Sequence, residues 1–295
     1  MNINALSFDI EEYFHVHAFS DVILKRDWHR YESRVVPSTR TILRILRTHR
    51  TKATFFVLGW VAERWPDLIK EIHGEGHEIA SHGYEHDAVH TLTAKQLAVD
   101  LLRAKEAIIA ACPAAELAGY RAPSFSIDRS MSWAFDELNA AGFKYDSSVS
   151  AASLHDRYGD HHAPRFPYEV APGILEIPTS TVRLFGKNLP AVGGGHFRIA
   201  PLDISRRAIR RINREGHSAV IYLHPWEFDT DQPRGHGAHW KARFRHYVNI
   251  GKTATRLERL LQEFPFGRMD NVFAEPISRI VVSDCSSAAN QAEAV

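Results

Sequence analysis

Two histidines stand four residues apart in the segment "SHGYEH", at His82 and His86. If this segment forms a helical turn, positions i and i+4 share one face, so both imidazoles could reach a single ion. Imidazole is a good ligand for Zn²⁺, Co²⁺ and Ni²⁺. Two histidines with one carboxylate leave a coordination position open, which is typical of catalytic zinc sites. By itself the spacing is weak evidence and more often means two histidines on a helix surface, so other parts of the chain must decide.

Three acids crowd the segment "FDIEEYF", at Asp9, Glu11 and Glu12, where a buried strand is expected to end. Buried carboxylates are costly unless they are paired or bound to a metal. One of these acids would then ligate the ion, and another would take a proton from an attacking water. The alternative interpretation is a strand end that is acidic and solvated.

Two further segments carry side chains suited to acid–base chemistry. His224 ends the apolar segment "AVIYLH", and since histidine titrates near neutral pH it is either a general acid or a structural core histidine. Arg121, in "GYRAPSF", either forms a structural ion pair or holds a catalytic carboxylate through two hydrogen bonds. The segment "VGGGH" at 192–196 lacks both common phosphate-binding glycine patterns, so we expect a flexible loop there.

Alternating strand and helix patterns must position these residues. Apolar segments rich in β-branched and aromatic residues predict strands at 4–10, 53–59, 77–82, 117–123, 143–148, 173–181 and 217–228. Apolar residues at helical spacing predict helices at 37–49, 64–76, 93–112, 129–142, 202–216 and 253–264. Residues 150–200 interrupt the alternation and are rich in His, Pro and Gly, which predicts a long functional loop.

The alternation predicts an α/β fold with parallel strands, and about seven such units favour a (β/α) barrel over a doubly wound open sheet. The carboxyl ends of parallel strands lie at one edge of a sheet, where active sites form. Predicted strands end at or next to Asp9, His82, Arg121, Asp146 and His224. We therefore expect these side chains to converge.

The composition is that of an ordinary globular protein, with 295 residues, 44% hydrophobic and 24% charged. A net charge of +1 gives no case for a nucleic-acid or acidic-membrane partner. The two cysteines, Cys112 and Cys285, lie far apart, which argues against a disulfide framework and favours a reducing compartment.

The chain shows no secretory signal pattern at its start and no apolar stretch near the roughly 18 residues of a membrane span. We therefore expect a cytoplasmic protein. One domain is expected over residues 1–275, including a C-terminal extension. The small and polar residues at 276–295 predict a disordered tail.

Taken in order, these segments resemble the five motifs of the NodB-type polysaccharide deacetylases, carbohydrate esterase family four. The first family motif, T-F-D-D-G, is similar to residues 7–11, "SFDIE". The second, H-[ST]-x-x-H, is similar to 82–86, and the third, R-x-P-[YF], to 121–125. The fourth centres on Asp146, and the fifth, L-x-H, is similar to 223–224.

A narrower resemblance is carried by "FDIEEYFHVHAF", "LHPWEFD" and "RFRHYVNIGKTATRLERLLQEFPFG". These segments resemble the deacetylase subgroup associated with exopolysaccharide gene clusters of exosortase/PEP-CTERM systems. The implied activity is removal of acetyl groups from N-acetylated sugars in exopolysaccharide biosynthesis, with release of acetate. Whether the substrate is a polymer or a lipid-linked precursor stays open. The implied fold is a distorted (β/α) barrel.

The resemblance also implies a metal site and catalytic roles. The cofactor would be one divalent ion, with Zn²⁺ favoured and Co²⁺, Ni²⁺ or Mn²⁺ as alternatives. Its implied ligands are Glu11, His82 and His86, with Glu12 as the other candidate acid. The implied catalytic residues are Asp9 as base, Arg121 orienting that base, His224 as general acid, and Asp146 as the acid that tunes His224.

Other residues would contact the substrate or depart from the family pattern. The Ser124 amide would hold the oxyanion, in place of an aromatic residue's amide. Phe125 and Trp226 either stack on sugar rings or pack in the core. Gly83 replaces the usual hydroxyl residue, so one hydrogen bond beside the metal site is expected to be missing.

Other functions remain as alternatives. Allantoinase-like cyclic-amide hydrolases share the barrel and some motifs. A carbohydrate-binding protein would keep the fold without catalysis, but Asp9, His82, His86 and His224 are all present, which argues against it. A scaffold in a biosynthetic complex would leave no trace in the sequence. No nucleic-acid partner and no membrane span are expected.

Overall fold

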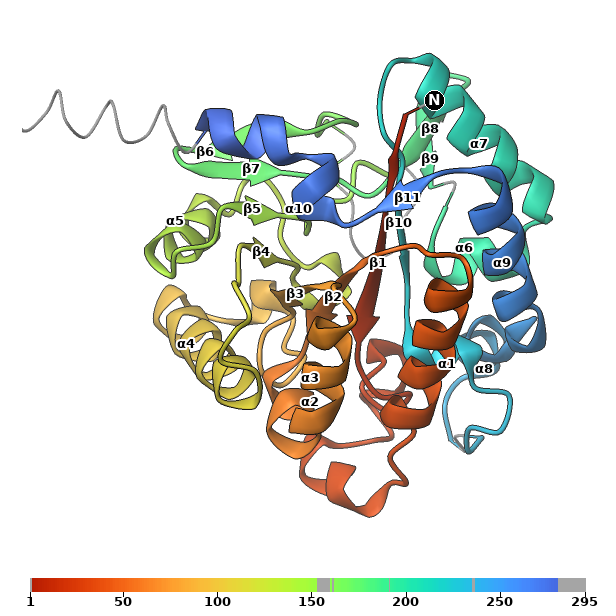
Figure 1. The fold of residues 1–295 in the computed structure, drawn as a ribbon. Helices are drawn as coiled ribbons and strands as arrows, with labels where there is room; N and C mark the ends of the chain where they lie inside the picture. The colour runs from red at the N-terminus through yellow and green to blue at the C-terminus, as the bar shows by residue number, and fades with distance from the viewer. Residues whose placement is uncertain (1, 153–159, 161, 191, 235–236, 281–295) are drawn as a thin grey trace, which may run out of the picture.

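One curled sheet forms the centre of the computed structural model, which describes residues 2–152, 160, 162–190, 192–234 and 237–280. The spatial order of its strands is β10-β1-β2-β3-β4-β5-β7-β6 (Figure 1). Their bounds are β1 (Asn4–Ile10), β2 (Thr54–Val57), β3 (Glu78–Ser81), β4 (Gly119–Tyr120), β5 (Tyr145–Asp146), β6 (Tyr168–Ala171), β7 (Ile174–Glu176) and β10 (Val220–Leu223). A short further strand, β11 (Phe266–Gly267), pairs with the start of β1.

The strands from β10 to β7 are all parallel to their neighbours, and only the edge strand β6 is antiparallel. The expected seven parallel strands are therefore confirmed. The segment that follows β7 meets β10 at one point, where the Ser180 N–H donates to the Val220 carbonyl at 3.3 Å and the Val220 N–H donates to Ser180 Oγ at 2.8 Å. The fold is a distorted, incompletely closed (β/α) barrel, as expected.

Helices cover the outside of this sheet (Figure 1). Their bounds are α1 (Val35–Thr48), α2 (Gly59–Arg64), α3 (Pro66–Gly74), α4 (Ala94–Ala111), α5 (Ser132–Ala140), α6 (Gly194–Ile199), α7 (Leu202–Arg214), α8 (Trp240–Tyr247), α9 (Thr253–Glu263) and α10 (Met269–Val272). All seven residues of β1 are buried, because the strand has neighbours on both edges and side chains packed against both faces. Among the helices of the described part, none has the length and apolar composition of a membrane span.

The stretch 150–200, predicted as one long loop, contains regular structure in part of its described residues. Besides β6 and β7, it forms a hairpin of β8 (Thr181–Leu184) and β9 (Lys187–Pro190). Phe185 and Gly186 join these strands with φ of 49° and 76°, the left-handed pair that a tight hairpin turn requires. Residues 153–159, 161 and 191 lie outside the described residues, so the loop prediction stays untested there.

The "VGGGH" segment is not the expected flexible loop but the start of α6. Gly193 has φ of 120°, and a Cβ there would lie 2.6 Å from the Tyr222 ring. Glycine is therefore required for α6 to pack directly on β10. Glycine-rich segments have low helix propensity, so only this tertiary contact explains the helix.

The predicted tail at 276–295 falls mostly outside the described residues. Residues 274–280 are helical, and Ile280 is buried in the same apolar cluster as Met269 and Phe273. Disorder stays a prediction for 281–295.

Two neighbouring acids are buried side by side in the sheet. Asp146 on β5 is in register with Glu176 on β7, and both are fully buried. Burial raises the pKa of Asp146 to about 6. Burial and the adjacent Asp146 charge raise the pKa of Glu176 well above its usual value. Ser148 Oγ links the pair to the third motif, because it donates to Asp146 and accepts the Ala122 N–H at 2.7 Å. The pair therefore shares a proton near neutral pH.

This acid pair predicts a specific loss of stability with rising pH. The folded state holds a proton that the unfolded chain releases near pH 4.5. The contribution of the pair to stability is therefore largest below that pH and is lost as pH rises through the raised folded-state pKa. Glu176→Gln removes this titration while keeping the side chain's shape. Between about pH 5 and about pH 8 its melting temperature should fall less than that of the wild type. The difference corresponds to up to about 1.4 kcal/mol in the free energy of unfolding per pH unit. Parallel melting curves for Glu176→Gln, wild type and the exposed control Glu116→Gln would contradict this.

Candidate active site

A cleft of about 410 Å³ opens at the carboxyl ends of β1, β3 and β10. Its walls include most of the side chains that the sequence singled out, namely Asp9, Glu11, His82, His86, Ser124, Phe125, His224 and Trp226. Glycines 194 and 195, Arg198 and Ile199 bring α6 to its rim, and Ala242, Arg245 and His246 bring α8. The expected convergence of strand ends is therefore observed for these residues.

Glu11, His82 and His86 form a cluster suited to a metal ion. One ligand atom from each residue can be chosen so that all three lie within 4.8 Å of one another. Glu11 Oε2 lies 2.6 Å from His86 Nε2, and both side chains are almost fully buried. The histidines do not converge through the expected helical turn, because residues 82–88 form an irregular loop in which Gly83 and His86 have φ of 76° and 57°.

Asp100 on α4 shapes this loop. Its carboxylate accepts the Tyr84 N–H at 3.1 Å. A Cβ at Gly83 would lie 2.8 Å from Asp100 Oδ2, and the positive φ also disfavours any side chain there. The Asp100 carboxylate of α4 thus occupies the space that a side chain at position 83 would need. Sequence inspection missed Asp100 because it lies inside a regular helical pattern.

The tautomer of His82 follows from its contact with the backbone. His82 Nδ1 lies 2.7 Å from the Arg121 carbonyl, which can only accept a hydrogen bond, so Nδ1 carries the proton. The Nε2 lone pair is then available to an ion. Burial lowers the pKa of His82 to about 4, so the ring is neutral at pH 7.

Glu11 is held at both carboxylate oxygens. The Trp226 indole N–H donates to Oε1 at 2.9 Å, while Oε2 contacts His86. Burial alone would raise the pKa of Glu11, but the contact with His86 and the nearby His224 imidazolium lower it far below its usual value. The carboxylate is therefore ionised at any physiological pH.

Trp226 packs inside the protein. It is only 7% exposed, and its ring stacks between those of His224 and His246, with centroid distances of 5.1 and 4.3 Å. Of the two interpretations of Trp226, the structure therefore favours core packing over sugar stacking.

Glu12 points away from the cluster and caps α1. Its carboxylate accepts the N–H groups of Arg34 and Val35, at 2.9 and 3.1 Å, and the Ser33 hydroxyl. A carboxylate at a helix N-terminus satisfies backbone donors that have no partner within the helix. The geometry thus leaves Glu11 as the acid beside the two histidines.

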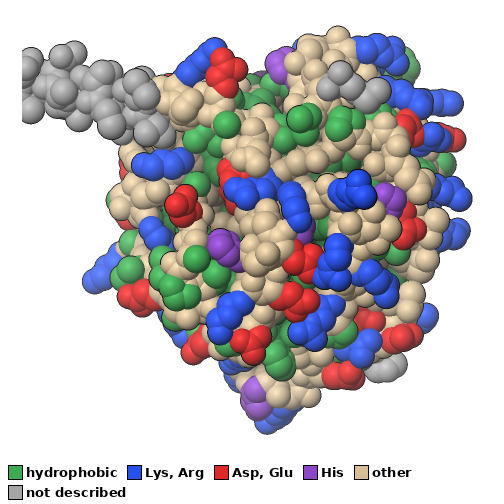
Figure 2. All heavy atoms as spheres, viewed as in Figure 1, with side chains coloured by type: hydrophobic (Ala, Val, Ile, Leu, Met, Phe, Trp, Pro, Cys, Tyr) green, Lys and Arg blue, Asp and Glu red, His purple; other side chains and the backbone are tan. Residues whose placement is uncertain are grey.

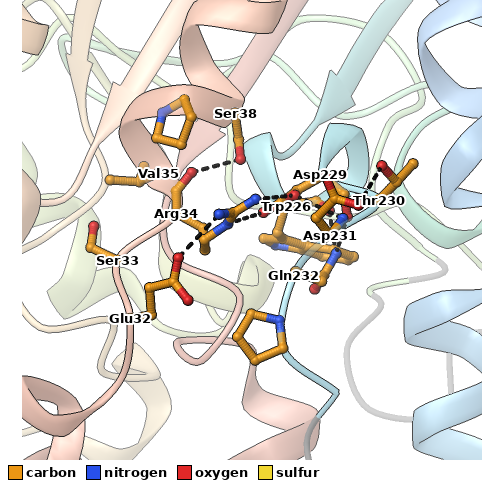
Figure 3. Close-up of polar contacts among 12 residues, drawn as sticks. Glu32, Ser33, Arg34, Val35, Ser38, Trp226, Asp229, Thr230, Asp231 and Gln232 are labelled. Carbon is orange, nitrogen blue, oxygen red and sulfur yellow. Dashed lines mark hydrogen bonds and ion pairs between the residues drawn. The ribbon is translucent and has the colours of Figure 1, made fainter.

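The segment after β10 is attached to the same end of α1 (Figure 3). The Arg34 guanidinium donates to both oxygens of Asp229, at 2.8 and 2.9 Å. The Gln232 amide donates to the carbonyls of Trp226 and Asp229, at 2.7 and 3.0 Å. These bonds hold the turn that carries Trp226 against the start of α1, and sequence inspection did not find them.

Asp9 is bound by Arg121, as the resemblance implies. Arg121 is fully buried, and its Nη1 donates to Asp9 Oδ1 at 2.7 Å and to Ser7 Oγ at 2.8 Å. Its Nε and Nη2 donate to the carbonyl and hydroxyl of Ser147. The contact with Asp9 uses one nitrogen rather than the expected two hydrogen bonds. Asp9 Oδ2 lies 3.7 Å from His224 Nε2.

His224 belongs to a buried chain of charges, but its acidic partner is not the expected one. His224 Nδ1 lies 2.7 Å from Glu227 Oε1, and Arg198 Nε donates to Glu227 Oε2 at 2.6 Å. Asp146, predicted to tune His224, instead pairs with Glu176 in the sheet. That role prediction was wrong, because Glu227 lies one short turn after His224 and reaches Nδ1 directly. The H-x-x-E spacing in "HPWEF" was the available signal.

This chain of charges controls the protonation of His224. Burial would lower its pKa, but the hydrogen bond to Glu227 and the charges of Glu11, Glu227 and Asp9 outweigh burial and raise it to about 9. The ring is therefore an imidazolium at neutral pH, with Nδ1 donating to Glu227. Its Nε2 lies 3.7 Å from Asp9 Oδ2 and 3.9 Å from Glu11 Oε1, so the Nε2 proton is on the side of these two carboxylates. This is the protonation state that a general acid requires.

Ser124 and Phe125 lie at the cleft with strained backbones. Both have positive φ, 58° and 54°, which is costly for residues other than glycine and is often found at functional sites. The Phe125 N–H donates to the Ala122 carbonyl at 3.0 Å, so the expected oxyanion donor remains the Ser124 amide. The half-buried Phe125 ring packs edge-on against Tyr222, with centroids 4.7 Å apart.

Family models match two successive parts of the chain. Residues 30–145 match "Polysaccharide deacetylase", and residues 147–274 match "Domain of unknown function (DUF3473)". The first match includes His82, His86 and Arg121 but begins after Asp9 and Glu11 and ends before His224. The two matched parts share one sheet, in which β5 pairs with β7.

Curated relatives match a smaller part of the chain. A chitooligosaccharide deacetylase of Sinorhizobium fredii is 38% identical over 85 residues, 29% of this chain and 40% of that protein. A peptidoglycan-N-acetylglucosamine deacetylase of Bacillus cereus is 37% identical over 87 residues, 30% of this chain and 29% of that protein. The chain thus spans two fifths or less of these relatives' own lengths.

Solved structures share the fold over nearly the whole chain. A Mycobacterium smegmatis protein assigned to the polysaccharide deacetylases has a TM-score of 0.61 at 20% identity, covering 95% of this chain and 90% of that one. A family 4 carbohydrate esterase from Streptomyces lividans has a TM-score of 0.50 at 16% identity, covering 90% and 91%. The chain therefore has the NodB-like fold of these proteins, and its residues 30–145 match the polysaccharide deacetylase family model.

Proposed function

We propose that this chain is a metal-dependent hydrolase that removes acetyl groups from N-acetylated sugars and releases acetate. The observation that carries the proposal is the cleft itself. It places the cluster of Glu11, His82 and His86 beside Asp9 and a protonated His224. The deacetylase domain and the names of its relatives support the reaction class.

The residues of the cluster fit a divalent ion. Two imidazoles and one carboxylate form the donor set of many catalytic zinc sites, which also leave a position open. His82 offers its Nε2 lone pair and Glu11 is ionised, so neither must lose a proton to bind. Zn²⁺ is the favoured ion, with Co²⁺, Ni²⁺ and Mn²⁺ as alternatives. When bound, the ion would polarise the acetyl carbonyl and make an attacking water more acidic.

Asp9 and His224 would move the protons. Arg121 holds one oxygen of Asp9, and the other oxygen is the one nearer His224, so Asp9 would accept the proton of the attacking water there. His224 would donate its Nε2 proton to the leaving amine, while Glu227 and Arg198 keep its Nδ1 engaged. The Ser124 N–H would stabilise the oxyanion of the tetrahedral intermediate.

The substrate would be an N-acetylated sugar of an exopolysaccharide under construction. The curated relatives are named for chitooligosaccharides and peptidoglycan N-acetylglucosamine, which share the N-acetyl group. Phe125 is the aromatic ring placed to stack on a sugar, because it lines the cleft and is half exposed. We infer the exopolysaccharide role from the segments "LHPWEFD" and 243–267, which resemble that subgroup.

Acetate release tests the proposal directly. Wild type should release acetate from N-acetylglucosamine oligomers, and a chelator should abolish the release. His82→Ala/His86→Ala should lose both bound metal and activity. Asp9→Asn should keep the metal but lose roughly 10²–10⁴-fold in kcat, the usual contribution of a general base. The exposed control His29→Ala should behave as wild type.

Two outcomes would contradict the proposal. Acetate release by the double histidine variant at the wild-type rate would show that catalysis does not depend on a metal ion bound by Glu11, His82 and His86. Hydrolysis of cyclic amides such as allantoin, with no acetate released from any sugar, would assign the cleft to the related amide hydrolases.

Glu227→Gln tests the role of His224 as an acid. The acid must be protonated, so activity should fall as pH rises through its pKa of about 9. Without the Glu227 charge this pKa falls, and the alkaline limb of kcat/KM should move to lower pH by one unit or more, which leaves about tenfold less activity than the wild type at pH 10. A bound dication would lower the pKa in both proteins, so the difference between them is the readout. An equal loss at every pH, with no shift, would show that Glu227 is only structural.

A further inference from the structure

Although the net charge of the chain is only +1, residues 232–257 form a strongly basic region. Between Asp231 and Glu258 the sequence contains no acid. The same interval contains six basic side chains, at Arg234, Lys241, Arg243, Arg245, Lys252 and Arg256. Lys and Arg side chains also gather on the side of the molecule formed by α7 and α9 (Figure 2). The region as a whole is therefore suited to an anionic partner.

Helix α8, in the middle of this region, exposes two large aromatic side chains. Trp240 and Phe244 are 67% and 61% exposed and stand four residues apart, on one face. Lys241 and Arg245 are exposed beside them. His246, on the opposite face, is buried against Trp226. A helix that exposes aromatic rings together with cations matches the composition of helices that lie on membranes.

This face adjoins the mouth of the active-site cleft. Ala242 and Arg245 of α8 line the cleft, as does Ile199 of α6. Ile199 is itself 48% exposed, and α6 packs against α8. In the fold, α8 lies at the end of the molecule to which β1 points (Figure 1). Exposed apolar side chains and cations therefore surround one side of the entrance.

We propose that α8, with Ile199, docks this protein on the surface of an anionic lipid bilayer. Trp240, Phe244 and Ile199 would enter the headgroup region, while the basic side chains would contact lipid phosphates. An aliphatic side chain in the patch favours lipid, since sugar rings stack on aromatic faces. Docking would bring the cleft entrance to the membrane, where a lipid-linked sugar would be the substrate. Only this last step rests on the proposed function.

Vesicle sedimentation tests the docking with the metal-free 295-residue chain, so that the outcome does not depend on deacetylation. Wild type should sediment with vesicles of phosphatidylcholine and phosphatidylglycerol, and less with phosphatidylcholine alone or in high salt. Trp240→Ala/Phe244→Ala should bind at least about tenfold more weakly. The matched control is Phe185→Ala, because Phe185 is 95% exposed but lies at the distant β8–β9 turn. This variant should bind vesicles as the wild type does.

Activity on a soluble oligosaccharide separates docking from damage to the cleft. The Trp240→Ala/Phe244→Ala variant should release acetate from short N-acetylglucosamine oligomers at the wild-type rate. Three results would overturn the proposal: no sedimentation of wild type, unchanged sedimentation of the double variant, or an equal loss in Phe185→Ala. Binding to a soluble acidic polysaccharide but not to vesicles would also overturn it, and would assign the face to glycan recognition.

Discussion

The ionised carboxylate of Glu11, buried at the end of β1, is the constraint on which the site depends. A buried carboxylate is costly unless it is hydrogen-bonded or paired, and Glu11 is held at one oxygen by the Trp226 indole and faces His86 at the other. These two partners come from segments far apart in the sequence. The fold must therefore hold both the loop after β3 and the turn after β10 in fixed positions beside β1.

Each of those segments is held by charged groups that do not contact Glu11, His82 or His86. Asp100 on α4 fixes the loop of the two histidines, and Arg34 holds the turn of Trp226 through Asp229. The same turn carries Glu227, which with Arg198 keeps His224 protonated. The two parts of the chain that match separate family models thus contribute to one site, together with Asp9 and Glu11, which precede both parts. The first part provides the histidine pair, and the second provides His224 and its partners.

The sequence predicted much of this arrangement and failed where tertiary contacts override local pattern. Periodicity predicted β1 at its observed bounds, the parallel sheet, and the convergence of Asp9, His82 and His224 at one edge. It could not separate Glu11 from Glu12, because that distinction depends on where α1 begins in space. The resemblance implied Asp146 as the partner of His224, whereas Asp146 lies on β5 in register with Glu176. The helix at "VGGGH" depends on packing against Tyr222, which no local pattern encodes.

The central claim is that Glu11, and not its neighbour Glu12, completes a metal site with His82 and His86. The most direct measurement is the metal content of Glu11→Gln and Glu12→Gln after identical loading, by elemental analysis. We expect about one ion per chain in wild type and in Glu12→Gln, and a loss of the ion in Glu11→Gln. Glu12→Gln should differ only in a lower melting temperature, because α1 loses a charged cap. An ion retained in Glu11→Gln and lost in Glu12→Gln would contradict the account.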